Sequence, residues 1–436
     1  MRTALSKVTA WLRHWPRRKI LVVGASTLAV LLVATAGTGY VILRHFNANL
    51  QQADIRGLLG NQPVDTHPQA ENILVIGSDS RQGLSKAYGT GLVTDQSDTM
   101  MIIHIPADRK WAEVMSIPRD SWVDIPACEM GNGQFSAPAQ FKINSAFATG
   151  NLDGNNTALG IACTVKTIEQ DTAIYIDHFI VVNFTGFQNM VAALGGVYEC
   201  NPTPINDPNS GLHLAAGTHL LTPVQALGYV RARYTLGDGS DLERIGRQQA
   251  FMSSLISRVK SELLDPVAIY RFLDAATRSL TIDSQLGGIT GLYNLGQSLR
   301  SIPSDKIAFF TIPNFPRSEE VPGDTANVLW SQPQDNEIFA SFVDDVPASS
   351  TLFDSAPPTI TSSGEHLVEP SASGTATSSG SPASGTATSS GSPASTATAS
   401  AGTSPTASAT VSPTASATAS PATIQARTAN QSICAG

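Results

Sequence analysis

The 436 residues would allow two or three domains by length alone. The formal net charge is −8 at pH 7, which excludes a uniformly basic chain and makes any dense group of arginines a local feature. Residues 355–423 are nearly all Ser, Thr, Ala, Gly and Pro, a composition that excludes this stretch from a packed hydrophobic core.

An uncharged apolar run, ILVVGASTLAVLLVATAGTGYVIL, covers residues 20–43 near the N-terminus. As a helix it would be about 36 Å long, enough to cross a hydrocarbon core of about 30 Å. Arginines and lysines are concentrated before the run, and only Arg44 and Arg56 follow it over a similar distance, which predicts a cytoplasmic N-terminus and an extracellular remainder. A cleaved signal peptide is the alternative, because ATA at 34–36 could serve as a cleavage site. We expect a cytoplasmic segment at 1–19, a transmembrane helix at 20–43 and a linker at 44–69.

Three short apolar runs open the region that we expect to fold as the catalytic domain, residues 70–345. They are NILVIG at 72–77, TMMIIHI at 99–105 and WAEVMSI at 111–117, and PADRK between the last two is typical of a hairpin turn. Because the runs are continuously apolar rather than alternating, they favour strands that are covered on both faces. Helices are therefore expected on both sides of the sheet.

The polar residues next to these runs are predicted to meet at one edge of the sheet. If the three strands are antiparallel in succession, the end of the first, the start of the second and the end of the third lie together. Polar residues occur wherever a chain turns, so one alone indicates little, but several acids and arginines on a common edge favour a ligand site. The residues concerned are Asp79, Arg81, Asp98, Arg119 and Asp120.

The following part of the region is predicted to contain helices and one more strand. ALGIACTVKTIEQ at 158–170 has helical spacing, DHFIVVNF at 177–184 is typical of a strand, and TGFQNMVAALGG at 185–196 is typical of a helix that ends at its glycines. Thr222, with Gln225 three residues later, forms a capping-box arrangement that predicts the start of a further helix.

The segment YVRARYTLGDGSDLERIGRQQ, residues 229–249, contains Arg231, Arg233, Arg244 and Arg247. One interpretation is a solvated helix whose arginines pair with the acids between them. The other is a binding site for a strongly anionic ligand, because several guanidinium groups are placed close together in an acidic chain.

The second half of this segment is predicted to begin a helix that runs to about residue 263. Ser240 and Glu243 give it an S-x-x-E start. Arg244, Arg247 and Gln248 share one face within its first two turns, where free backbone N–H groups and the helix dipole favour an anion. The expected core stripe is Leu242, Ile245, Met252, Ile256 and Val259.

Guanidinium groups and carboxylates together indicate a phosphate chemistry. Arg provides parallel N–H donors that match phosphate oxygens, and each charge-assisted hydrogen bond contributes about 1.5–3 kcal/mol. Asp79 and Asp98 are hard oxygen donors that suit Mg²⁺ (or Mn²⁺) shared with phosphate oxygens, so the set predicts metal-assisted phosphoryl transfer. The G-x-x-x-x-G-K-[ST], H-E-x-x-H and G-x-S-x-G motifs of other nucleotide-binding, metalloprotease and hydrolase sites are absent from the sequence.

These motifs together resemble the LytR-CpsA-Psr family of Gram-positive cell envelopes, and the composition resembles that of actinobacterial members. The resemblance implies an extracellular α/β/α sandwich with a central mixed sheet, held in the cell membrane by one N-terminal helix. It also implies an enzyme that transfers a glycopolymer from a polyprenyl-pyrophosphate carrier to peptidoglycan through a phosphodiester. The motifs are GSDSR (77–81), SDTMMIIHI (97–105), SIPRDSWVDIP (116–126), KINSAF (142–147) and the arginine segment at 229–249.

The resemblance also implies roles for individual residues. Asp79 and Asp98 match the magnesium-associated acids of the family and, with Arg119, would be catalytic. The chain is one residue longer within the arginine segment than many relatives, so Asp238 is an alternative to Asp241 as the acid of the site. The set implied for pyrophosphate binding is Arg81, Arg119, Arg231, Arg233, Arg244, Gln248 and Asp241.

The partners implied are the polyprenyl-pyrophosphate-linked glycopolymer, peptidoglycan and membrane lipid. No nucleic-acid partner is expected, since no helix-turn-helix pattern is present. Hydrolysis of a polyprenyl pyrophosphate by water and a non-enzymatic envelope scaffold or adhesin are the alternative functions, and the sequence leaves the glycopolymer and the general base open. For the apolar tunnel that the family uses for the lipid tail, Phe179, Phe184 and Met190 are candidates, with ordinary core packing as the alternative.

Four cysteines suit an extracellular location, where disulfides persist, and none has the spacing of a zinc site. Cys128 and Cys163 are the favoured pair, because both lie in the folded region at a plausible loop distance. Cys200 with Cys434 is a weaker prediction, and all three connectivities stay open.

A tail is expected at residues 346–436. SGTATSSGSPA occurs at 373–383 and again at 384–394, and such repeats have too little apolar bulk to offset the entropy of ordering. We expect a disordered segment that is either a glycosylated stalk or a spacer, and deletion of 355–436 is expected to leave catalysis intact.

Overall fold

The computed structural model describes residues 17–78, 96–131, 133–152, 156–233, 241–262, 265–348, 427–429 and 434, which all belong to one compact unit. Four residues discussed above, Asp79, Arg81, Asp238 and Ser240, lie outside the described residues, and so do the repeats within 355–423.

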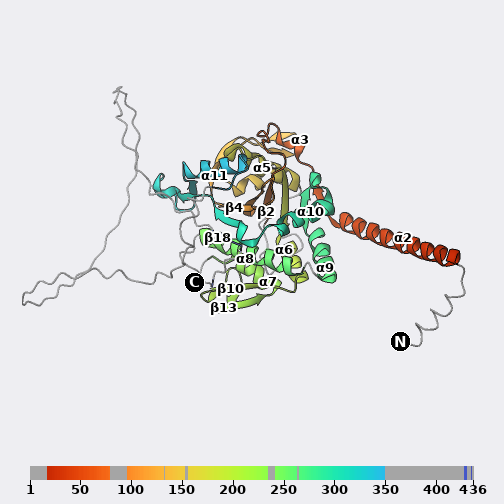
Figure 1. The fold of residues 1–436 in the computed structure, drawn as a ribbon. Helices are drawn as coiled ribbons and strands as arrows, with labels where there is room; N and C mark the ends of the chain where they lie inside the picture. The colour runs from red at the N-terminus through yellow and green to blue at the C-terminus, as the bar shows by residue number, and fades with distance from the viewer. Residues whose placement is uncertain are drawn as a thin grey trace, which may run out of the picture. The chain divides into compact units, whose positions relative to one another are not determined.

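A mixed sheet forms the centre of the described domain, with the strand order β1-β14-β9-β2-β3-β4-β15-β18 (Figure 1). β2, β3 and β4 are antiparallel in succession, as the apolar runs predict. On either side of them β9 is parallel to β2, and β15 is parallel to β4. The strands are β1 (Gln51–Ala53), β2 (Glu71–Ser78), β3 (Ser97–Ile105), β4 (Ala112–Ile117), β9 (His178–Asn183), β14 (Leu280–Asp283), β15 (Ile307–Thr311) and β18 (Arg427–Thr428).

Helices cover both faces of the sheet, so the predicted α/β/α sandwich is confirmed (Figure 1). Leu74 and Ile102 face one core, which they share with α4, α5 and α11. Their neighbours Ile73 and Met101 face the other core, which includes side chains of α8 and α10, because successive strand residues point to opposite faces. The helices of the domain are α3 (Arg56–Leu59), α4 (Asn144–Gly150), α5 (Thr157–Thr172), α6 (Phe184–Ala193), α7 (Pro223–Arg231), α8 (Asp241–Glu262), α9 (Pro266–Thr277), α10 (Gly288–Ser301) and α11 (Gln334–Val343), with 3-10 turns at Ser284–Leu286, Ser304–Lys306 and Arg317–Glu319.

Two-stranded sheets surround this centre within the described part of the chain. The pair β10–β13 packs beside α7 and α8, and β5–β8 continues from the end of β4. The pairs are β5 (Trp122–Ile125) with β8 (Ala139–Lys142), β6 (Glu129–Gly131) with β7 (Gln134–Phe135), β10 (Val197–Asn201) with β13 (Gly217–Leu221), β11 (Ile205–Asp207) with β12 (Leu212–Leu214), and β16 (Asn314–Pro316) with β17 (Val328–Trp330).

The helices of the arginine segment differ in one respect from the prediction. The capping box of α7 is present, since the Thr222 amide N donates to Gln225 Oε1 at 3.0 Å and the Gln225 amide N donates to Thr222 Oγ1 at 3.4 Å. In α8 the core stripe is wrong at its first position: Leu242 is 43% exposed, whereas Phe251 is buried. In the first two turns, three polar side chains, Arg244, Arg247 and Gln248, are buried beside Ile245.

The domain begins earlier in the chain than the predicted residue 70. β1 pairs in parallel with β14, and Ile55 and Leu59 belong to the core between the sheet and α5. The prediction of a linker over the whole of 44–69 is therefore wrong, because Gln51–Ala53 extends the sheet and Ile55 and Leu59 cover the core.

One long helix, α2 (Arg17–Asn49), contains the candidate membrane span, Leu21–Asn49. The helix continues beyond the predicted 20–43, and its last turns pack on the domain. His45 Nε2 lies 2.8 Å from Asp274 Oδ1, and the buried Phe46 ring contacts Tyr270. The helix thus enters the domain without a break.

Residues 427–429 and Cys434 are also part of the domain, which corrects the prediction of a tail over 346–436 and removes the reason to expect that deletion of 355–436 leaves catalysis intact. β18 pairs antiparallel with β15 and forms the edge of the sheet, and Cys434 forms a disulfide with Cys200 of β10. Composition could not reveal this, because the few residues that pair are separated from the rest of the fold by the repeats.

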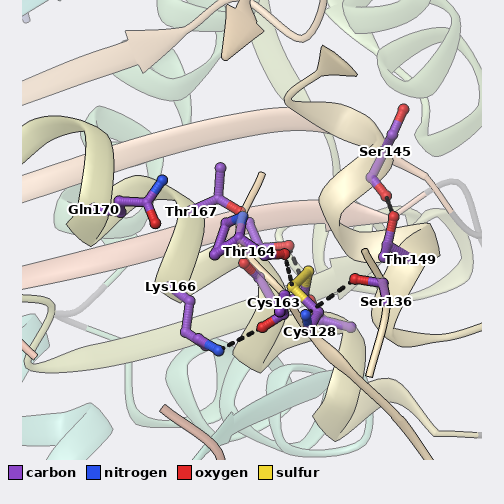
Figure 2. The surroundings of a disulfide bond; sticks show 12 residues. Cys128, Ser136, Ser145, Thr149, Cys163, Thr164, Lys166, Thr167 and Gln170 are labelled. Atoms are coloured by element: carbon purple, nitrogen blue, oxygen red, sulfur yellow. Dashed lines mark hydrogen bonds between the residues drawn. A yellow bond between two sulfur atoms is a disulfide. The ribbon is translucent and has the colours of Figure 1, made fainter. Parts of the chain in front are cut away.

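The favoured disulfide, Cys128 with Cys163, is present and joins the loop after β5 to α5 (Figure 2). The Cys128 amide N donates to Ser136 Oγ at 3.0 Å, and Lys166 Nζ donates to the Ala127 carbonyl at 2.7 Å, so the loop is held at several points (Figure 2). These contacts fix the β5–β8 pair, whose last residue reaches the candidate site.

The pKa values of several buried carboxyl groups lead to a prediction for how the stability of the protein depends on pH. Burial raises the pKa of four of them to about 7, opposed in part by hydrogen bonds. The folded protein therefore holds these protons more tightly than the unfolded chain, so the free energy of unfolding should fall as the pH rises from about 4.5 to about 7. A thermal unfolding series between pH 4.5 and pH 8 checks this. The four residues are Glu113, Glu169, Asp171 and Glu199.

Glu113 isolates the contribution of one such group, since it is 3% exposed and accepts the Ala348 amide N at 3.1 Å. Glu113→Gln should flatten the pH dependence and raise stability at pH 8 by up to about 3 kcal/mol. The matched control is Glu337→Gln, which changes an exposed acid on α11. An unaltered pH profile in the Glu113 variant would contradict the assignment.

Candidate functional site

Asp98 and Arg119 lie at the edge of the sheet where β2 ends, β3 begins and β4 ends. The register explains why, because Ser78 at the end of β2 lies opposite Ser97 at the start of β3. Of the five residues that the sequence predicts at this edge, the structure brings together the three that it describes. Asp79 follows Ser78 directly in the chain, outside the described residues.

Arg119 is surrounded by three carboxylates. Its Nη1 lies 2.6 Å from Asp98 Oδ1, and its Nε lies 3.5 Å from Asp241 Oδ1 and 3.6 Å from Asp120 Oδ2. Burial acts to lower the pKa of Arg119, but the three carboxylates outweigh it and the pKa is raised. The guanidinium therefore stays charged and fixed in orientation.

Asp241 occupies a corresponding position among guanidinium groups. Its Oδ1 lies 2.7 Å from Arg244 Nη2, 3.5 Å from Arg119 Nε and 3.8 Å from Arg233 Nη2. Asp241 is the first residue of α8, where the positive end of the helix dipole also favours a carboxylate. One acid thus permits three arginines from separate elements to approach one another, since like charges would otherwise repel.

Arg244 is the most enclosed of these arginines, at 4% exposure. Its Nη2 donates to the Asp98 carbonyl at 3.0 Å as well as facing Asp241. Burial lowers the pKa of Arg244 to about 10, with Asp241 opposing the shift, so the side chain remains cationic at neutral pH. A buried cation of this kind favours an anionic ligand in the adjacent space.

Arg231 and Arg233 leave the end of α7 in different directions. The Arg231 guanidinium carbon lies 4.7 Å from the centre of the Phe184 ring, a cation–π contact. Phe184 directly follows Asn183, whose Cα partner is Ser78, so Arg231 is placed beside the end of β2. Arg233 faces Asp241, and its amide N donates to Asp207 Oδ2 at 2.7 Å.

Arg247 and Gln248 lie beneath this turn. Arg247 donates to the Ala232 carbonyl, between the two arginines, and its Nη1 lies 3.7 Å from Glu243. Gln248 Nε2 donates to Thr99 Oγ1 at 2.9 Å and to the Val230 carbonyl at 3.1 Å. Both side chains are therefore engaged with the protein. The interpretation of this segment as a solvated helix is wrong in that Arg244 and Arg247 are buried, but the acid pairs that it predicted are present for both arginines.

Lys142 and Asn144, which carry no predicted role, also reach this edge. Lys142 Nζ lies 2.7 Å from Asp120 Oδ1, and Asn144 Nδ2 donates to Gln96 Oε1 at 3.4 Å. The Asn144 Oδ1 atom is buried and accepts no hydrogen bond among the described residues. The signal for both was the KINSAF motif, which places a lysine and a buried amide between a strand and a helix.

The three candidates for a lipid tunnel lie in different parts of the described domain. Phe179 belongs to the core that includes α5, Met190 packs against the opposite face of the sheet, and Phe184 supports Arg231. The interpretation of Phe179 and Met190 as ordinary core residues is the one that fits.

Asp98 has the chemistry of a magnesium ligand. Arg119 engages its Oδ1, and its side chain is 26% exposed, so Oδ2 is the donor that a cation could use. The described residues contain no group of three His, Cys, Asp or Glu side chains that could hold a metal ion alone. Phosphate oxygens would have to complete such a site, as is usual for Mg²⁺.

Comparison with known proteins identifies a matching protein family. The LytR_cpsA_psr family matches residues 45–339. A probable cell wall biosynthesis protein, LcpB of Corynebacterium glutamicum, is 36% identical over 220 residues, which cover 48% of this chain and 48% of LcpB. The polyisoprenyl-teichoic acid–peptidoglycan teichoic acid transferase TagT of Bacillus subtilis is 29% identical over 302 residues, which cover 66% of this chain and 84% of TagT.

Among solved structures, a LytR-Csp2A-Psr enzyme from Actinomyces oris superposes with a TM-score of 0.49 at 19% identity, over 67% of this chain and 95% of that one. The chain spans about half the length of LcpB.

Proposed function

Since the chain belongs to the LytR-CpsA-Psr family, we propose that it transfers a phospho-glycopolymer from a polyprenyl-pyrophosphate carrier to peptidoglycan. The observation that carries this proposal is the group of three arginines, Arg119, Arg233 and Arg244, which converge on Asp241 at the sheet edge. A diphosphate needs several fixed cations at close range, and the group supplies them. The activity in the name of TagT is of the same kind.

The proposed reaction is a displacement at the phosphorus that bears the glycan. A hydroxyl oxygen of peptidoglycan forms a bond to that phosphorus, the bridging P–O bond of the pyrophosphate breaks, and polyprenyl phosphate leaves with the bond electrons. The hydroxyl proton passes to a base at the site. Arg119, Arg233 and Arg244 would stabilise the charge that develops on the phosphate oxygens, and their prior orientation by Asp241 means that little reorganisation is needed.

Magnesium would bind Asp98 together with phosphate oxygens, and Asp79 is the second ligand expected from its place in the chain. Bound there, the cation would neutralise charge on the transferred phosphate. Within the described chain, Arg119 holds Asp98 in place through Oδ1. The proposal therefore gives Asp98 two roles, orienting Arg119 and binding the cation.

Asp98→Asn is expected to lower activity by about 10- to 100-fold and to remove the response to added Mg²⁺, because the amide keeps the shape but not the charge. Titrating Mg²⁺ or Mn²⁺ against initial rate is the measurement. Asp108→Asn, which changes an exposed acid at the other end of β3, is the matched control and should titrate like the wild type. An Asp98 variant that remains active and magnesium-responsive would exclude the metal assignment.

Supplying a labelled lipid-linked polymer together with peptidoglycan tests the reaction itself. Label in the peptidoglycan supports transfer, whereas free phosphorylated polymer would indicate the pyrophosphate hydrolase. A scaffold or adhesin would leave the donor intact.

The proposed location is the outer face of the cell membrane, with the N-terminus in the cytoplasm. The basic residues before the apolar helix and the two disulfides of the domain both support this orientation. Peptidoglycan and the lipid carrier would then both be within reach of the site.

A further inference from the structure

The C-terminal segment, defined here as residues 427–429 and Cys434, lies against the domain on the side of α8. Arg427 lies opposite Phe309 of β15, and the Ala429 amide N donates to the Ile307 carbonyl at 2.9 Å. The disulfide from Cys434 then joins the segment to β10. The segment is thus attached to two elements that flank the arginine helices.

Ala429 contacts α8 directly. Ser253 Oγ donates to its carbonyl, and the side chain, 4% exposed, lies in a core with Met252 and Ile256 of the same helix. Asp241 and Arg244 stand at the start of this helix. Because a helix moves largely as a rigid rod, a contact at its middle restrains the position of its N-terminal turns.

A second path runs through buried polar side chains. Glu199 of β10 is 4% exposed and lies within electrostatic range of both Arg427 and Tyr229. Burial raises the pKa of Glu199 to about 7, while a hydrogen bond from Ser254 and the charge of Arg427 oppose the rise. Arg427 is thus a cation that favours the ionised form of Glu199.

The path ends at the arginine turn. Tyr229 is 1% exposed on α7, and Glu199 and Arg247 both lie within electrostatic range of its hydroxyl group. Arg247 donates to the carbonyl of Ala232, the residue between Arg231 and Arg233. Arg427, which the β15–β18 pairing holds at the sheet, thus lies within electrostatic range of Glu199, and Glu199 and Arg247 both lie within electrostatic range of Tyr229.

We infer that the C-terminal segment positions the diphosphate-binding arginines, and that Arg427 is a positioning residue for this site. The segment holds α8 through Ala429 and the α7 turn through these buried side chains. The inference rests on the proposed function for the nature of the ligand, but not for the coupling between the segment and the turn.

The test uses the full chain in detergent. Arg427→Met removes the charge while keeping most of the side-chain volume, and Arg427→Lys restores a cation. Truncation after Ala426 removes the whole segment. The matched control deletes residues 361–421 and keeps the segment. The residues that remain between Ala348 and Arg427 can span this distance, because Ala348 is hydrogen-bonded to β4 and β18 lies two strands from β4 in the sheet.

Two measurements are made on each variant. Binding of geranylgeranyl pyrophosphate should be about tenfold weaker in Arg427→Met, largely restored in Arg427→Lys and unchanged in the repeat deletion. Hydrogen exchange of the amides in 229–233 and 241–248 should be faster in Arg427→Met and in the truncated chain, and normal in the repeat deletion.

Wild-type exchange and binding in Arg427→Met would overturn the inference, and so would a loss of binding that appears only with global unfolding. If the wild type fails to bind the lipid but exchange still responds to Arg427, the proposed function is wrong and the coupling stands.

Discussion

Arg119→Ala is expected to reduce glycopolymer transfer by about 100- to 1,000-fold, the usual cost of removing one fixed donor from a transition-state site. Arg119 is in contact with Asp98, Asp120 and Asp241, so its loss removes a phosphate donor and leaves three carboxylates facing the ligand. Initial rates with a lipid-linked donor, at saturating and low donor concentration, would separate lost binding from lost catalysis.

Arg109→Ala is the matched control for Arg119. Arg109 is also partly buried and pairs with an acid, Glu71 at 2.6 Å, but at the opposite end of the β2–β3–β4 group. It should cost stability without a comparable loss of turnover. If both variants lose activity in proportion to their thermal stability, Arg119 has no special part in the reaction.

Gly150→Ala is expected to lower the free energy of unfolding by about 3 kcal/mol or more. A Cβ at Gly150 would lie 2.2 Å from the Leu159 carbonyl oxygen and 2.8 Å from the Gly160 amide N, so α4 and α5 would have to separate. Because these are backbone atoms, no side-chain rotation can relieve the contact. Urea denaturation of the purified protein measures the change.

Gly246→Ala is the contrasting variant, since a Cβ there meets no atom within 4 Å and the residue lies inside α8. It should raise stability by up to about 1 kcal/mol through helix propensity alone. A loss of stability in Gly150→Ala together with a gain in Gly246→Ala would support the close contact at Gly150. An unchanged stability of Gly150→Ala would show that α4 and α5 are not closely packed.

The central fold was predictable because its signals are local. Continuous apolar runs identified β2, β3 and β4, and a capping box identified the start of α7. The early start of the domain was missed, because β1 spans only Gln51–Ala53 and has no periodicity of its own. β18 was missed for the same reason, as its two residues become a strand only by pairing with β15.

The candidate site was predictable as a set but not in its internal order. Antiparallel succession of the strands was enough to bring Asp98 and Arg119 together. Some of the arginines face Asp241, whereas Arg247 supports the turn from behind. This difference depends on how α7 and α8 cross, which residue spacing along one helix does not determine. Lys142 needed the β5–β8 pairing to reach Asp120.

The return of the chain to the domain limits how far its repeats can extend. Seventy-eight residues separate Ala348 from Arg427, which at about 3.4 Å each could reach about 265 Å from a single attachment. With both ends fixed, the furthest point lies at half that contour, about 130 Å. A single proteolytic cut within the repeats would release no fragment, because the disulfide between Cys200 and Cys434 keeps the part after the cut covalently attached to the domain.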